Sequence, residues 1–120
     1  MTKQPLSNEQ FKEIYSKVPR FNVELIVVTK EGVVLAKRSI EPCIGRWHIP
    51  GGTVYFGETP EMAVERVAMD ELGVKVSINE LLGVITYPKM HADGYFGWPL
   101  GVAYEVTITD GTIRGSYQGE

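Results

Sequence analysis

Apolar and polar residues alternate most clearly over residues 21–29, and this alternation predicts a β-strand, because successive side chains of a strand point to opposite faces. One face of the strand is wholly apolar and consists of Phe21, Val23, Leu25 and Val27. On the other face, Glu24 stands between Asn22 and Ile26. The pattern leaves two positions open for Glu24: buried in a central strand, or exposed near the start of the strand.

Helical spacing first occurs near the N-terminus, where it predicts a helix over residues 8–18. Ser7 and Gln10 match a capping box, and Leu6 with Phe11 matches a hydrophobic staple. Pro19 ends the helix. The apolar residues recur at the spacing of one buried helix face and are Phe11, Ile14, Tyr15 and Val18.

A second helix is predicted from Pro60 to Leu72. Thr59 is a favourable N-cap, and Pro60 suits the first helical position, where its missing N–H costs nothing. Gly73 suits the position just after the helix, where the backbone often turns left-handed.

The remaining apolar runs predict strands separated by turns and one longer loop. The turn at 30–32 should return the chain as a partner strand for the first one. Asp110-Gly111 is a hairpin signal. The predicted strands are 33–37, 47–52 (a short extended segment), 74–78, 81–87, 100–109 and 112–117, with a loop at 88–97. Strands and helices in no strict alternation predict an α/β fold, in which helices pack on a mixed sheet.

Composition and charge narrow the range of functions. The 120 residues suit one domain spanning 1–120, with 43% hydrophobic and 22% charged residues. A net charge of −3 gives no basic footprint for nucleic acid. No apolar run approaches the ~18 residues of a membrane span, and the single Cys43 supports neither a disulfide framework nor a thiolate metal cluster. We therefore expect a cytoplasmic protein with no nucleic-acid or membrane partner.

Two acidic residues lie at the C-terminal end of the second predicted helix, where negative charge lowers helix stability. Asp70 and Glu71 face the negative end of the helix dipole, and Glu58 precedes the N-cap. Oxygen-only ligands of this kind suit Mg²⁺ or Mn²⁺. The alternative is an amphipathic helix with solvated acids. Upstream, Gly51 and Gly52 either let a ligand approach the backbone closely or permit an unusual turn.

The stretch from Gly52 to Val74 resembles the Nudix box, a long gapped motif formed by a loop and a helix. The positions that match it are Gly52, Glu58, Arg66, Asp70, Glu71, Gly73 and Val74. Three positions depart from the usual motif. Val67 stands where the first helix Glu is usual, Asp70 replaces a Glu, and Ala68 is small for an apolar position.

The resemblance covers roughly residues 21–117 and implies the family's α/β/α sandwich with a mixed β-sheet. Nudix hydrolases act on a nucleoside diphosphate linked to another moiety, with Mg²⁺ held by acids of the box. Carried over to this chain, the resemblance makes Glu71 a catalytic residue and metal ligand. It makes Gly51, Glu58 and Asp70 further metal ligands, and Arg66 a catalytic residue that orients a carboxylate.

The valine at position 67 favours one branch of the family, the GDP-mannose mannosyl hydrolases, which also carry an apolar residue there. That branch attacks the sugar carbon, releases GDP and forms dimers, so a homodimer is implied here. Glu24 falls at its substrate-binding acid and Arg38 at its diphosphate-binding arginine, and the substrate also lies near Gly51 and Gly52.

Other positions depart from that branch. Thr53 stands where the branch has a second Arg, and Pro99 about where it has a phosphate-contacting Tyr. The sequence ends at Glu120, before the last loop and helix typical of the family, so we expect a shortened chain or a minimal member. The branch's general base lies in that loop. His91 is a fallback base by its usual pKa, the alternative being an exposed loop histidine.

The sequence therefore predicts a Mg²⁺-dependent Nudix hydrolase of a nucleotide sugar of the GDP-mannose type. Two alternatives are a Nudix pyrophosphohydrolase of other nucleotides and a nucleotide-binding Nudix domain without efficient catalysis. The substrate is in each case a small nucleotide. The residues do not decide whether water attacks carbon or phosphorus. They also do not identify the nucleobase or the sugar of the substrate.

Overall fold

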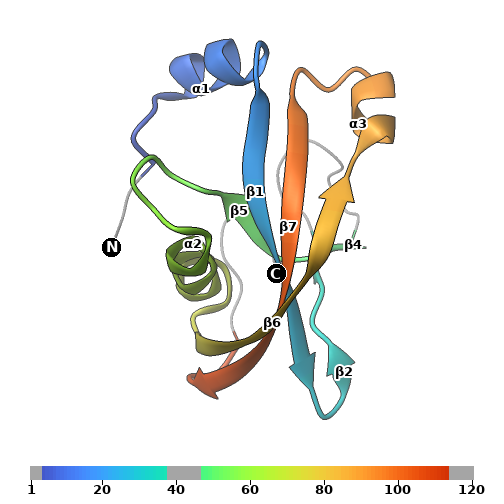
Figure 1. The fold of residues 1–120 in the computed structure, drawn as a ribbon. Helices are drawn as coiled ribbons and strands as arrows, with labels where there is room; N and C mark the ends of the chain where they lie inside the picture. Colours follow the sequence, from blue (N-terminus) through green and yellow to red (C-terminus); the bar gives the residue numbers. More distant parts are fainter. Residues whose placement is uncertain (1–3, 38–46, 114–120) are drawn as a thin grey trace.

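The computed structural model describes residues 4–37 and 47–113, drawn as a coloured ribbon in Figure 1. Arg38 and Cys43 lie outside the described residues, as does most of the strand expected at 112–117. The elements in chain order are α1 (Asn8–Tyr15), β1 (Pro19–Thr29), β2 (Gly32–Val33), β3 (Ala36–Lys37), β4 (Trp47–His48), β5 (Gly51–Thr53), α2 (Pro60–Val67), the π-helical turn η1 (Ala68–Leu72), β6 (Lys75–Thr86), α3 (Pro88–Ala92) and β7 (Trp98–Asp110).

A mixed sheet of five strands forms the centre of the fold, which confirms the predicted α/β class. Its order is β2-β1-β7-β6, and β5 pairs with β1 beside this path. β1 runs parallel to β7 and antiparallel to β2 and β5, and Figure 1 shows β1 and β7 side by side in the middle. Strands β3 and β4 form a separate two-stranded sheet.

The hydrophobic core lies between this sheet and the helical segment formed by α2 and η1. The apolar face of β1 contributes to it as the alternation predicts, except that Phe21 is exposed. Glu24 points to the opposite face of the sheet and is buried there. The core consists of Val23, Leu25, Val27, Ala63, Val64, Val67, Ala68, Leu72, Val74, Tyr104 and Val106.

The helix predicted over 60–72 is confirmed at both ends. The Thr59 side chain accepts a hydrogen bond from Met62 N at 3.1 Å, and Gly73 turns left-handed with φ 72°. The sequence did not predict that the last five residues wind as a π-helix. Gly73, the residue that caps this turn, donates its backbone N–H to Ala68 O five residues back, which is the π-helical spacing. A wider turn changes the direction of the side chains that follow α2, including the two acids at its end.

The first helix differs from its prediction. Its capping box is present, with Gln10 N donating to Ser7 Oγ at 3.1 Å and Ser7 N donating to Gln10 Oε1 at 2.9 Å. The helix ends at Tyr15, however, and none of its residues is buried. The expected buried face is wrong, since Ile14 is 41% and Val18 46% exposed. The physical reason is its place in the fold: α1 lies at one end of the sheet (Figure 1) rather than on a face.

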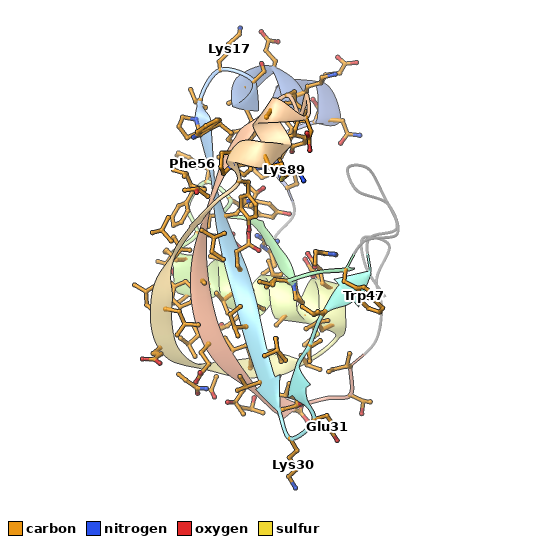
Figure 2. All side chains as sticks on the ribbon, turned by 90° about the vertical axis from the view of Figure 1, so that its right-hand side faces the viewer. Lys17, Lys30, Glu31, Trp47, Phe56 and Lys89 are labelled. Atoms are coloured by element: carbon orange, nitrogen blue, oxygen red, sulfur yellow. The ribbon has the colours of Figure 1, made fainter. Side chains whose placement is uncertain are left out.

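Two strand predictions are corrected by the pairing. Of the partner strand expected at 33–37, Val33 pairs with β1, as does Gly32 of the predicted turn, while Ala36–Lys37 pairs with β4. The strands expected at 74–78 and 81–87 form one strand, β6, because irregularities near Ile78 and Leu81 let the pairing with β7 continue. Figure 2 shows Lys30 and Glu31 at the tip of the β1–β2 turn, at the opposite end of the sheet from Lys17.

The loop predicted at 88–97 contains the short helix α3. Five residues are too few to show a helical period, and Pro88 at its start was the only local signal. Thr112 and Ile113 are outside any strand, so the described part of the predicted last strand is absent. Among the helices of the described residues, none combines the length and apolar character needed to cross a membrane.

Candidate active site

The two consecutive glycines of β5 place two acids on opposite sides of one strand. Gly51 pairs with Glu24 of β1, and a Cβ at position 51 would collide with the Glu24 carboxylate. Gly52 faces the other way, and a Cβ there would lie 3.0 Å from Val67 Cγ2 and 3.9 Å from Glu71 Oε2. Neither glycine has a positive φ, so close approach, rather than an unusual turn, explains why both positions lack a side chain.

Glu71 and Asp70 lie in the π-helical turn, on the α2 side of β5. The Glu71 residue is buried, with 8% of its surface exposed, and its side chain faces Gly52. The carboxylate of Asp70 approaches Arg66, with Oδ2 3.8 Å from Nη1. Its other oxygen, Oδ1, is buried and accepts no hydrogen bond from the residues that the structure describes.

Glu58 is held by Arg66 rather than directed toward the other acids. Arg66 Nε lies 2.7 Å from Glu58 Oε2, Nη2 lies 3.1 Å from Oε1, and Nη2 also donates to Thr53 O at 2.7 Å. The guanidinium stacks on the Tyr55 ring with its carbon 3.6 Å from the centroid. Burial alone would raise the pKa of Glu58, but hydrogen bonds from Arg66 and Tyr55 N and the Arg66 charge hold it below its usual value.

Only some of the predicted metal ligands are placed where they could bind a hard cation such as Mg²⁺. Within residues 4–37 and 47–113, no three His, Cys, Asp or Glu side chains are arranged to hold a metal ion. Asp70 and Glu71 nevertheless offer oxygen donors, and the buried Asp70 Oδ1 is an acceptor left to be satisfied. Mg²⁺ keeps several waters and is usually bound through one or two carboxylates, so these two residues suit it.

Glu24 is enclosed on the opposite face of the sheet. It is 7% exposed, and Tyr87 donates a hydrogen bond to its Oε1 at 2.8 Å. A Cβ at Gly101 would lie only 2.8 Å from Glu24 Cγ. Burial raises the pKa of Glu24 from 4.5 to about 7, although the Tyr87 hydrogen bond and the Arg20 charge act to lower it. The open question about Glu24 is therefore resolved in favour of burial in a central strand.

Glu24 should make the folded state less stable as the pH rises toward neutrality. Its pKa is raised on folding, so the folded state binds more protons than the unfolded chain between about pH 4.5 and 7. The stabilisation from the protonated carboxyl is complete below pH 4.5 and is lost through pH 7. Relative to Glu24→Gln, the wild-type free energy of unfolding should fall by roughly 3 kcal/mol across this window.

Urea unfolding in EDTA at several pH values measures this difference. Glu80→Gln is a matched control, because Glu80 is exposed on β6, and it should follow the wild-type curve. A constant difference between wild type and Glu24→Gln from pH 4.5 to 7 would contradict the prediction.

The sequence missed two residues that shape the surroundings of Glu24. Gly101 lies inside a long strand, and an isolated glycine in a strand pattern often marks close approach of another group, so a signal was present. Tyr87 lies 63 positions after Glu24, and no local pattern links the two.

The other predicted positions are distributed as follows. Val67 is buried in the core beneath Gly52. Thr53 contributes its carbonyl to Arg66. Pro99 is buried and pairs with Arg20 of β1. His91 lies in α3, and its side chain, like the whole of Arg38, is outside what the structure describes.

Comparisons with known proteins find relatives of this chain by sequence and by fold. A family model described as "NUDIX domain" matches residues 18–107. The chain is 36% identical over 112 residues to "Low-salt glycan biosynthesis protein Agl8" of Haloferax volcanii, covering 91% of this chain and 72% of that protein. It is 35% identical over 96 residues to "ADP-ribose pyrophosphatase" of Methanocaldococcus jannaschii, covering 80% of this chain and 55% of that protein.

Among solved structures, the MutT NUDIX hydrolase of Burkholderia pseudomallei matches with a TM-score of 0.77 at 28% identity. That match covers 87% of this chain and 80% of the other. A NUDIX hydrolase of Nitrosomonas europaea matches with a TM-score of 0.71 at 23% identity, over 86% of this chain and 55% of the other. The chain thus spans little more than half of some proteins that it resembles.

Proposed function

The chain belongs to the Nudix hydrolase family, and from this we propose that it is a Mg²⁺-dependent hydrolase of a nucleotide sugar of the GDP-mannose type. The observation that carries the proposal is the pair of acids on either side of β5. Glu71 faces Gly52 on the α2 side, and Glu24 lies against Gly51 on the other. A site for a metal-bound diphosphate and a site for the attached moiety would then be separated by the thickness of one strand.

The names of two relatives support the substrate class. One relative is named for glycan biosynthesis, and the other for ADP-ribose, which is a nucleoside diphosphate linked to a sugar. Both names are compatible with a substrate in which a sugar is attached to a nucleoside diphosphate.

Asp70 and Glu71 would hold the cation. The resemblance also implies Gly51 and Glu58 as ligands, and Glu58, whose two oxygens accept hydrogen bonds from Arg66, would act through water. A bound Mg²⁺ supplies Lewis-acid neutralisation of diphosphate charge, which makes a nucleoside diphosphate a better leaving group. Arg66 keeps Glu58 in place and ionised through the two hydrogen bonds described above.

Val67 favours attack at the sugar carbon. The position is buried in the core, and a valine can neither accept a proton nor bind a metal, so the base used for attack at phosphorus in other branches is missing. Glu24 is proposed to bind the sugar, Arg38 the diphosphate, and His91 to act as the base.

Product analysis tests the proposal directly. The protein is incubated with Mg²⁺ and GDP-mannose, ADP-ribose or simple nucleoside triphosphates, and the products are separated by chromatography. GDP and free mannose are expected. A nucleoside monophosphate with a sugar phosphate would instead indicate a pyrophosphohydrolase, and turnover of triphosphates alone would reject the nucleotide sugar. Binding without any product would indicate a nucleotide-binding domain.

A further inference from the structure

The face of β1 that carries Glu24 bears three polar side chains in a row. Arg20, Asn22 and Glu24 alternate with the core residues, so all three lie on the sheet face opposite α2. This row extends from the buried acid toward the end of the sheet where α1 lies (Figure 1). Of these three residues, only Glu24 was given a role by the resemblance to the Nudix family.

Two atoms of this row are buried with no hydrogen-bond partner among the described residues, namely Arg20 Nε and Asn22 Oδ1. Buried polar atoms are almost always satisfied in folded proteins, because an unmet donor or acceptor lowers stability. One donor and one acceptor at neighbouring positions of the same strand face are therefore available to a ligand that supplies both partners.

The row is held in place before any ligand binds. The Arg20 guanidinium lies 5.1 Å from the centre of the Phe11 ring and 5.7 Å from that of Tyr95, and such contacts restrict its side chain. Asn22 lies between Gly101 of β7 and Thr53 of β5. The Glu24 side chain lies over Gly101, where a Cβ would approach it within 2.8 Å, so Glu24 and Asn22 are neighbours on this face.

We propose that Arg20 and Asn22, together with Glu24, form a recognition row that binds the hydroxyl groups of the sugar attached to the nucleoside diphosphate. A hydroxyl accepts a hydrogen bond from an arginine N–H and donates one to an amide oxygen, so one chemical group serves both unmet atoms. The Cα atoms of residues two apart on a strand are about 6.6 Å from each other, so side chains of neighbouring positions in the row can reach one sugar ring. The identification of the ligand as a sugar rests on the proposed function. The observation that the two atoms lack partners is independent of that function.

A nucleobase edge also presents a donor beside an acceptor, and the test separates it from a sugar. Dissociation constants are measured by calorimetry in EDTA for GDP-mannose and ADP-ribose, and for GDP and ADP, which lack the attached sugar. Asn22→Ala should weaken binding of whichever nucleotide sugar binds the wild-type protein by about tenfold. It should leave binding of the matching nucleoside diphosphate unchanged.

Stability provides a second readout, because Asn22→Ala removes an unmet polar atom and should not lower the free energy of unfolding. Asn79→Ala is the matched control: Asn79 Nδ2 donates to Glu105 Oε2 at 3.1 Å and to Thr107 Oγ1 at 2.9 Å. This control should lose some stability and keep its affinity. Arg20→Lys, which keeps the charge and removes Nε, should weaken binding of the nucleotide sugar in the same direction as Asn22→Ala.

Unchanged affinity for the nucleotide sugar in both Asn22→Ala and Arg20→Lys would overturn the proposal. An equal loss for the nucleoside diphosphate would assign the row to the base and overturn the sugar. If the wild-type protein binds neither nucleotide sugar, the proposed ligand is also wrong. Binding that depends on Asn22 without any hydrolysis in Mg²⁺ would retain the row and reject the proposed enzymatic function.

Discussion

Glu71→Gln is expected to lower metal-dependent turnover by about three orders of magnitude, because a neutral amide replaces a metal-binding carboxylate. Lewis-acid stabilisation by a bound cation contributes several kcal/mol to the transition state, and each 1.36 kcal/mol corresponds to a factor of ten in rate. Glutamine has nearly the same shape, so the packing of the buried Glu71 side chain beside Gly52 should survive. The measurement is kcat/KM for GDP-mannose hydrolysis as a function of Mg²⁺ concentration.

The control for Glu71→Gln lies on the same helical segment. Glu65 is exposed on α2, and Glu65→Gln changes the net charge by the same amount without touching the proposed metal site. It should retain wild-type turnover and Mg²⁺ dependence. Wild-type turnover by Glu71→Gln would remove Glu71 from the metal site, and equal losses in both variants would point to a general effect of charge.

Arg66→Met is expected to lower the free energy of unfolding by about 3–5 kcal/mol, the cost of leaving one charge of a buried ion pair without its partner. The side chains of Arg66 and Glu58 are only 8% and 4% exposed. The variant also loses the hydrogen bond to Thr53 O and the contact with the Tyr55 ring. Such a loss is a large part of the total stability of a small domain and is measured by urea unfolding.

An exposed ion pair provides the comparison for Arg66→Met. Lys17 Nζ lies 3.4 Å from Glu13 Oε1 with both side chains largely in solvent, so Lys17→Met should change stability by less than about 0.5 kcal/mol. Adding Glu58→Gln to Arg66→Met removes the stranded charge and should restore part of the loss. A change for Arg66→Met as small as that for Lys17→Met would show that the buried pair is not stabilising the loop before α2.

Local signals in the sequence predicted the elements that depend on local chemistry. The capping box at Ser7 and the Thr59–Pro60 start of α2 were read correctly, because caps are satisfied by residues three positions away. The same holds for the left-handed Gly73. The alternation over β1 gave both faces of the strand, including the side on which Glu24 lies.

Features that depend on distant parts of the chain could not be read in the same way. The burial of Glu24 depends on β5 and β7 lying on either side of β1, and the bond from Tyr87 depends on where β6 ends. The apolar period of α1 correctly indicated a helix but not its burial, because a period says nothing about which surface is available to cover it. No residue pattern over 68–72 predicted the π-helical turn, which became apparent only from the structure.

The parallel pairing of β1 with β7 has a consequence for how the chain folds. Its partners, from Pro19 with Trp98 to Val27 with Val106, are about 80 positions apart in the chain. Closing so long a loop costs conformational entropy before the strand pairing contributes any stabilising contacts. We therefore expect the centre of the sheet to form late and folding to be slow for a domain of this size. On the ribosome, the edge of β1 that β7 will cover is open until residues 98–110 have been made, and an open strand edge is where aggregation begins. Nascent chains that end before β7 are therefore the species that most need a chaperone.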